Sequence, residues 1–117
     1  MATSEQTLVG SWLTLGEVAD RLGVSASKVR QMGREHELVV LRPPGLREWC
    51  VPAEMLVDGA VVKGLSGTLT LLADHGLTEE ESLEWLFTPD ESLPGRPIDA
   101  LRGDRGREVR RRAQVIV

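Results

Sequence analysis

The sequence is poor in residues on which several kinds of protein depend. Its 117 residues include one cysteine, one phenylalanine, three tryptophans and no tyrosine. Because Cys50 is the only cysteine, no disulfide can form within the chain, which fits a reducing compartment such as the cytoplasm. Single-stranded nucleic acid is bound on platforms of several exposed aromatic rings, so the shortage of rings argues against that mode.

Segments for export or membrane insertion are also missing. The N-terminus, MATSEQTLVG, has no basic region followed by an apolar core, as a signal peptide would. No apolar run approaches the roughly 20 residues that a membrane span needs. We therefore expect a cytoplasmic protein with no membrane contact.

The sequence offers no cluster of residues suited to catalysis or metal binding. His36 and His75 are isolated, and Cys50 has no partner histidine or base for nucleophilic work. The glycine-rich stretch GLSG, residues 64–67, lacks the lysine and the spacing of a phosphate-binding loop. We predict that the protein is not an enzyme and binds no metal or cofactor.

Charge is unevenly distributed along the chain, although the net charge is only -4. Residues 26–47 contain five basic residues (lysine or arginine) and two glutamates. Residues 59–101 contain only two basic residues but eight acidic ones. Residues 102–117 hold six arginines against two acids. Basic segments of this kind are the electrostatic signature of nucleic-acid binding, which the summed charge conceals.

The stretch LGEVADRLGVSASKVRQM predicts two short helices joined by a tight turn. Thr14 and Glu17 have the spacing of a capping box, which predicts a helix over residues 15–22. Gly23 ends that helix, because glycine accepts the left-handed conformation found at helix ends. Ser25 is then the cap of a second helix that extends to about residue 36.

The apolar residues of this stretch have the spacing of a DNA-binding helix-turn-helix. A small residue, Ala19, falls where the second helix crosses the first. The positions that must face inward are all apolar: Val18, Leu22, Val24, Val29 and Met32. An ordinary pair of packed helices has a similar pattern and remains the alternative.

The outward positions of the second helix are the candidate DNA contacts: Ser25, Ser27, Lys28, Arg30, Gln31 and Arg34. Arginine pairs with guanine and glutamine with adenine in the major groove, so Arg30 and Gln31 are predicted to read bases. The two serines suit phosphate contacts, and Lys28 and Arg34 suit the DNA backbone. A solvated helix face with ordinary surface charge is the alternative.

A β-hairpin is predicted directly after the second helix. Residues 38–41 and 48–51 are strand-like, and the prolines and glycine of residues 42–47 form a turn between them. Arg42 and Arg47 lie at its tip, where the wing of a winged helix would meet the DNA backbone or minor groove. A plain surface turn with two arginines is the alternative.

The second strand of this hairpin must present either Trp49 or Cys50 to the core, because successive side chains point to opposite faces. We expect Trp49 to face inward. Pro52 is then expected to open a short helix as its first residue.

The second half of the chain is predicted to be helical. Residues 65–76 place Leu65, Leu69, Leu72 and Ala73 on one face. The next helix follows Thr78 and ends at Pro89, with Leu83, Leu86 and Phe87 on its apolar side. A short turn of helix begins at Pro97, and a last helix from about Asp104 carries Val109, Ala113 and Ile116.

The last helix is both basic and amphipathic. Its arginines suit a second DNA contact, and its apolar side suits self-association or docking on the acidic middle of the chain. We expect the docking.

These observations predict a mainly α fold with a small β-hairpin. We expect a flexible tail over residues 1–11, a winged helix-turn-helix over residues 12–58, and a helical C-terminal region over residues 59–117 packed on it. The predicted function is non-enzymatic binding of double-stranded DNA, as in a transcriptional regulator. Helix 25–36 would lie in the major groove and wing 42–47 on the backbone.

The sequence resembles an actinobacterial family of small winged helix-turn-helix DNA-binding proteins, typified by a mycobacterial substrate of a serine/threonine protein kinase. The likeness covers most of the chain after the tail. It is carried by LGEVADRLGVSASKVRQ, VVKGLSGTLTLLADHG, EWLFTPDESL and RPIDALRGDRGREVRRRAQ, of which WLFTPD and RPIDAL are the most specific. The resemblance implies the same fold, DNA binding and no enzymatic activity, with the recognition helix at residues 25–34.

The resemblance also implies regulation by a kinase that acts on a threonine of the N-terminal tail. Thr3 and Thr7 are the candidate phosphorylation sites, although neither has a matching context. Added negative charge near a DNA-binding face would repel phosphates.

The C-terminal half is similar in outline to a second group, the toxin-binding regions of certain antitoxins. The segment GRPIDALRG fits that outline loosely. The alternative function is therefore an antitoxin-like interaction module, in which the C-terminal half binds a small partner protein and DNA binding is autoregulatory. A homodimer through the last helix is also open.

Overall fold

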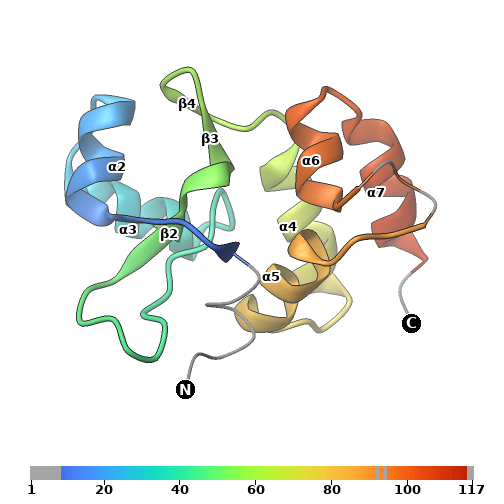
Figure 1. The fold of residues 1–117 in the computed structure, drawn as a ribbon, viewed down its shortest axis with the longest axis horizontal. Helices are drawn as coiled ribbons and strands as arrows, with labels where there is room; N and C mark the ends of the chain where they lie inside the picture. The colour runs from blue at the N-terminus through green and yellow to red at the C-terminus, as the bar shows by residue number, and fades with distance from the viewer. Residues whose placement is uncertain (1–8, 92, 94, 116–117) are drawn as a thin grey trace.

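The computed structural model describes residues 9–91, 93 and 95–115. The elements follow in this order: β1 (Trp12–Thr14), α2 (Leu15–Leu22), α3 (Ala26–Arg34), β2 (Cys50–Pro52), the 3-10 helix η1 (Ala53–Met55), β3 (Leu56–Val57), β4 (Ala60–Val61), α4 (Leu65–Asp74), α5 (Glu79–Phe87), α6 (Pro97–Arg102) and α7 (Gly106–Gln114). Figure 1 shows α2 and α3 at one end of the molecule and α6 and α7 at the other, with α4 and α5 between them.

The helix-turn-helix forms as its caps predict. In α2 the Glu17 N–H donates to Thr14 Oγ1 at 3.2 Å, and the Thr14 N–H donates to Glu17 Oε1 at 2.8 Å. Gly23 adopts the left-handed conformation, with φ of 71°, and its N–H bonds the Ala19 carbonyl at 2.8 Å. Helix α3 begins after Ser25 but ends at Arg34, because His36 has φ of 60° and cannot continue a helix.

The predicted hairpin is reduced to a single bridge. Only Leu41 pairs with Cys50, through N–H to carbonyl bonds of 2.9 and 2.6 Å. Residues 38–40 form no strand, and the consecutive side chains of Leu38 and Val39 are both buried in the core. The second strand, β2, begins at Cys50 and pairs antiparallel with β1, which precedes the helix-turn-helix.

The predicted orientation of Trp49 and Cys50 is wrong. Cys50 is 5% exposed and belongs to the core, whereas Trp49 is 42% exposed. Burial, together with the nearby Glu48 carboxylate, raises the pKa of the Cys50 thiol, so the group is a poor nucleophile. The indole tolerates the outer position because the Arg42 guanidinium lies 5.8 Å from its ring centre.

A second hairpin, which the sequence analysis does not predict, follows η1. Strands β3 and β4 pair through a turn at Asp58 and Gly59, both of which have positive φ, 50° and 77°. Asp-Gly is the preferred sequence of such a two-residue turn. The short helix predicted at Pro52 is the 3-10 helix η1, and Pro52 precedes it as the last residue of β2.

The C-terminal helices follow the predicted order. Helix α4 buries Thr68 where Ala73 was the predicted core residue, and the Thr68 hydroxyl donates to the Gly64 carbonyl at 2.9 Å. Helix α5 has a capping box between Thr78 and Glu81. Helix α6 begins at Pro97, as expected.

Helix α7 docks on α4 and α6 mainly through apolar contact, with one ion pair to the acidic middle of the chain, from Arg112 to Asp90 at 3.4 Å. Val109 and Ala113 are completely buried, while Ile116 lies outside the described residues. The start of α4 approaches α7 closely: a Cβ on Gly64 would lie 3.8 Å from the Cα of Gly106. Arg110 lies along the start of α4, where a Cβ on Gly64 would be 3.6 Å from its Nη1, whereas Arg107 and Arg111 are exposed to solvent.

The two halves share one hydrophobic core and are joined by polar contacts at its edge, which are only partly buried. Arg96, before α6, forms an ion pair with Glu54 of η1 and donates to both oxygens of Asp99 at 2.8 and 2.7 Å. Arg102 donates to the carbonyls of Glu54 and Leu56 at 2.8 and 2.7 Å. These contacts attach α6 to the end of the helix-turn-helix half.

The last residues of the tail predicted over residues 1–11 contact the fold, while the flexibility of the tail stays a prediction. Val9 is 3% exposed and part of the core. The Ser11 carbonyl accepts a hydrogen bond from the Ala53 N–H at 3.0 Å. The candidate phosphorylation sites, Thr3 and Thr7, lie outside the described residues.

Candidate nucleic-acid interface

Helix α3 buries one side and exposes the other, as a recognition helix requires. Val29, Met32 and Gly33 are buried against the rest of the fold. All the residues predicted on this helix to contact DNA are exposed: Ser25, Ser27, Lys28, Arg30, Gln31 and Arg34. The structure therefore places them on one accessible surface.

Ser25 has a structural task besides its predicted phosphate contact. Its hydroxyl oxygen accepts a hydrogen bond from the Lys28 N–H at 3.0 Å and so caps α3. The Ser25 O–H is still a donor. A phosphate placed at this end of α3 would also meet unpaired backbone N–H groups and the positive end of the helix dipole.

Gln31 is engaged within the helix. Its amide nitrogen donates to Glu35 Oε2 at 3.0 Å. This hydrogen bond is the main reason that the pKa of the Glu35 carboxyl is lowered. A second hydrogen bond, with Glu37, contributes in the same direction. A carboxylate is thus held beside the predicted base-reading side chain, a contact that the i, i+4 spacing of the two residues already indicates.

The helix and the segment leading to the wing are in direct contact at Gly33. A Cβ on Gly33 would lie 2.7 Å from Cγ2 and 3.1 Å from Cβ of Val40. Any side chain at this position would push the two segments apart. Gly33 is a positioning residue that the sequence analysis misses, although a glycine in the interior of a predicted helix is itself a signal.

The wing presents its two predicted cations and an aromatic ring that the sequence analysis assigns to the core. Arg42 and Arg47 are exposed, and Gly45 between them has φ of 90°. The Leu46 N–H bonds the Pro43 carbonyl at 3.0 Å, which closes the turn at the tip. The guanidinium of Arg42 lies over the ring of Trp49.

A shallow pocket of about 180 Å³ joins the helix to the wing. Its lining residues are Arg30, Gly33, Arg34, Val40, Trp49 and Glu79. Glu79 is the first residue of α5, so the C-terminal half reaches the edge of this surface. Burial, and secondarily the neighbouring Glu80, raise the pKa of the Glu79 carboxyl.

The cations of this surface form no ion pair with a described acidic residue. Within the described part of the chain, no ion pair involves any of the predicted cationic contacts: Lys28, Arg30, Arg34, Arg42 and Arg47. Guanidinium and ammonium groups left unpaired on one face attract phosphates. The helix face and the wing together form what we call the α3–wing surface, made of residues 25–34 and 42–49.

Among the described residues, no group of three or more histidine, cysteine or acidic side chains is arranged to hold a metal ion. No described helix combines the length and apolar character needed to cross a membrane.

Comparison with known proteins places the chain in a family. Two family models match it: "DNA-binding protein Rv2175c, wHTH domain" over residues 3–56, and "Rv2175c C-terminal domain of unknown function" over residues 62–116. The DNA-binding protein Rv2175c of Mycobacterium tuberculosis (strain ATCC 25618 / H37Rv) is 43% identical over 115 residues, which cover 87% of this chain and 77% of that protein.

The likeness extends to a solved structure. The NMR structure of Rv2175c superimposes with a TM-score of 0.79 at 42% identity, over 89% of this chain and 79% of that one. The predicted fold class, a winged helix-turn-helix followed by helices, is confirmed. The chain belongs to the Rv2175c family and carries both of its domains, the winged helix-turn-helix first.

Proposed function

We propose that this protein binds double-stranded DNA through the α3–wing surface and catalyses no reaction. The observation that carries the proposal is the continuity of that surface: Arg30 and Arg34 of α3 share one pocket with Trp49 of the wing. No ion pair among the described residues involves the cations around this pocket. The relative Rv2175c is named as a DNA-binding protein, which agrees with this assignment.

The roles within the surface follow from position and chemistry. Arg30 and Gln31 lie on the exposed side of α3 and would contact base edges in the major groove. Lys28 and Arg34 of α3 would bind phosphates, which fixes the register of the helix but carries no sequence information. Arg42 and Arg47 would hold the wing to the backbone.

Fluorescence anisotropy with a labelled random duplex at two salt concentrations tests the proposal. The double variant Arg30→Ala/Arg47→Ala removes one cation from the helix and one from the wing. Lys63→Ala is the matched control, because Lys63 is exposed but lies outside the α3–wing surface. We expect the double variant to bind more weakly with a smaller salt slope, and the control to bind as the parent does. Equal binding by all three proteins would refute the α3–wing assignment.

Transcriptional regulation from the cytoplasm is the cellular role that we propose for this binding. Regulation by a kinase acting on Thr3 or Thr7 is a separate proposal, supported by the charge that a phosphate would add near a DNA-binding chain. Mass spectrometry of the native protein tests it. Unmodified peptides covering both threonines would count against it.

The antitoxin-like alternative receives less support. The segment that would bind a small partner protein is used inside the fold: Arg96 bonds Glu54 and Asp99, and Arg102 bonds backbone carbonyls. The apolar residues of α6 are buried: Pro97, Ile98, Ala100 and Leu101. A stoichiometric small protein that co-purifies with the chain would revive this alternative.

A further inference from the structure

Helix α7 exposes arginines on the side that does not pack on α4. The helix lies on α4 through Val109 and Ala113 and turns its other side to solvent. The exposed cations along the cleft on that side, which we call the α7 arginine face, are Arg107, Arg111 and Arg112. Within the described residues, Arg112 alone among them has an acidic partner, Asp90, at 3.4 Å.

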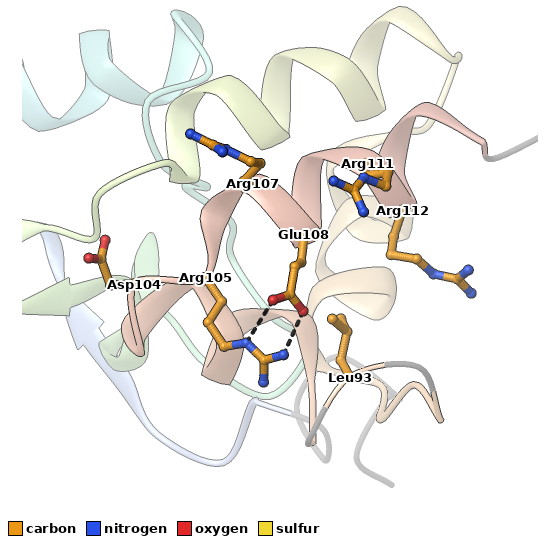
Figure 2. Close-up of a pocket in the computed structure, with 7 residues that line it drawn as sticks. All are labelled: Leu93, Asp104, Arg105, Arg107, Glu108, Arg111 and Arg112. Atoms are coloured by element: carbon orange, nitrogen blue, oxygen red, sulfur yellow. Dashed lines mark hydrogen bonds and ion pairs between the residues drawn. The ribbon is translucent and has the colours of Figure 1, made fainter.

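An open cleft of about 530 Å³ lies along this face (Figure 2). Four arginines line it against two carboxylates, those of Asp104 and Glu108. Figure 2 shows Glu108 turned toward Arg105, which donates to both its oxygens at 3.2 and 2.6 Å. One carboxylate is thus neutralised by its own neighbour, and the guanidinium groups of Arg107 and Arg111 remain available to an outside anion.

The α7 arginine face and the α3–wing surface lie at opposite ends of the molecule. Figure 1 shows α3 at one end and α7 at the other, with α4 and α5 between. The molecule measures 35 × 33 × 24 Å. The intervening segment is acidic, since α5 alone carries Glu79, Glu80, Glu81 and Glu84. A duplex that ran from one basic surface to the other would have to pass this acidic segment, which repels phosphates.

We propose that the α7 arginine face is a second contact for the backbone of duplex DNA, so that one molecule holds two separate duplexes. This inference rests on the proposed DNA binding by the α3–wing surface. Phosphate is the anion that fits, because a guanidinium group binds it with two parallel hydrogen bonds and requires no further anchor. The contact is independent of sequence, since charge attraction to the backbone does not distinguish bases.

The side chains of the face favour DNA over a protein partner. Protein interfaces depend on aromatic or apolar anchors set in pockets. The apolar residue of the cleft, Leu93, is buried in the core and offers no such anchor. The exposed side chains within α7 are arginines and Gln114, and Glu108 is partly exposed, so the helix supplies charge with little apolar contact area. The exposed apolar side chain nearby is Val115, which follows the last residue of the helix and does not line the cleft.

A bridging assay tests the proposal. One biotinylated random duplex is fixed on streptavidin beads, the full-length protein is added, and retention of a second, fluorescent duplex is measured across a range of salt. We expect the parent protein to retain the second duplex. Arg107→Ala/Arg111→Ala should abolish or sharply reduce retention and lower its salt slope by about two units, one for each phosphate contact removed. Arg107→Lys/Arg111→Lys keeps the charge and should retain most of the bridging.

Anisotropy with a single duplex separates the possible failures. The alanine double variant should still bind one duplex through α3 and the wing. Parent protein that binds one duplex but retains no second one would overturn the bridging proposal and leave the proposed function intact. Undiminished retention by the alanine double variant would also overturn it, because bridging would then come from another surface or from a dimer. Parent protein that binds no duplex at all would refute the proposed function itself.

A complementary variant guards against loss of folding. Arg30→Ala/Arg47→Ala leaves α7 intact, so its remaining affinity for a single duplex should come from the α7 arginine face together with Lys28, Arg34 and Arg42. Adding Arg107→Ala/Arg111→Ala should lower that remaining affinity further and reduce its salt slope. Equal affinity of the double and the quadruple variant, with thermal melting unchanged, would contradict the role of α7.

Discussion

Gly33 and Val40 meet so closely that a Cβ atom on the glycine would lie 2.7 Å from Cγ2 of the valine. This approach sets the spacing between the recognition helix and the segment that leads to the wing. The cations of α3 and of the wing are therefore placed relative to each other by a position that carries no side chain.

Replacing this glycine tests the spacing. Gly33→Ala should cost about 1–3 kcal/mol of unfolding free energy, as overpacking in a tight core does. It should also weaken binding to every duplex, because the wing would be displaced from the backbone. Gly16→Ala is the control: Gly16 lies in α2, where a Cβ meets only Thr14 Oγ1 at 3.9 Å. Urea melts would measure the unfolding free energy, and anisotropy would measure duplex binding. A Gly33→Ala protein with the stability and the affinity of the parent would contradict the account.

Arg30 and Arg47 should respond differently to substitution. Arg30→Ala should weaken binding to a preferred sequence by about 1–3 kcal/mol and weaken non-specific binding less, because a base contact is lost. Arg47→Ala should weaken all duplexes equally and lower the salt slope by about one unit. Competition titrations with specific and random duplexes measure both effects. If both variants weakened every sequence alike, the base-reading role of Arg30 would fail.

Glu35 should act against DNA binding. Its carboxylate is held by the Gln31 amide on the same helix and adds a negative charge to the α3–wing surface. Glu35→Gln should therefore raise the affinity for all duplexes, with the larger gain at low salt, where charges are screened least. Glu91→Gln removes the same charge from the loop after α5 and should have a smaller effect. A gain of equal size from both variants would mean that net charge alone is responsible.

The contact between Arg96 and Asp99 predicts a loss of stability in acid. The hydrogen bonds from Arg96 hold the pKa of the Asp99 carboxyl below its usual range. A carboxyl whose pKa is lowered by folding stabilises the fold above its unfolded pKa, about 3.9, and loses that contribution as the pH falls through the folded pKa. Asp99→Asn should therefore be less stable than the parent at pH 7, with the difference shrinking in urea melts near pH 3. A difference that is constant with pH would contradict this.

The helix ends could be predicted from sequence because they depend on contacts between near neighbours. Thr14 with Glu17 and Thr78 with Glu81 form the capping boxes that their spacing predicts. Gly23 adopts the left-handed conformation expected of it. Each depends on local hydrogen bonds and backbone sterics, so four or five residues contain the information.

The features that were predicted wrongly depend on tertiary packing, which local sequence patterns do not describe. A strand alternates sides whichever residue comes first, so the sequence does not say whether Trp49 or Cys50 faces inward. The apolar run at residues 38–41 fits a strand as well as it fits the buried segment that it forms. The turn at Asp58 and Gly59 is a different case, since its signal is present in the sequence and was overlooked.

The exposure of the individual residues of the candidate site could be predicted from the sequence. The packing that holds the recognition helix against the wing could not. The exposure of Arg30, Arg34, Arg42 and Arg47 follows from helix periodicity and from the turn. The close packing at Gly33 depends on a partner seven residues away across a loop of irregular path, which no local pattern encodes.

Trp49 offers the most direct test, because it lines the pocket that joins the recognition helix to the wing. A titration of tryptophan emission with unlabelled duplex, on the parent and on Trp49→Phe, reports contact at this one place. The account predicts a saturable, salt-sensitive change in emission for the parent that is absent from Trp49→Phe, while anisotropy shows that both proteins bind. Binding by the parent with no change that depends on Trp49 would contradict the claim that α3 and the wing form the DNA-binding surface.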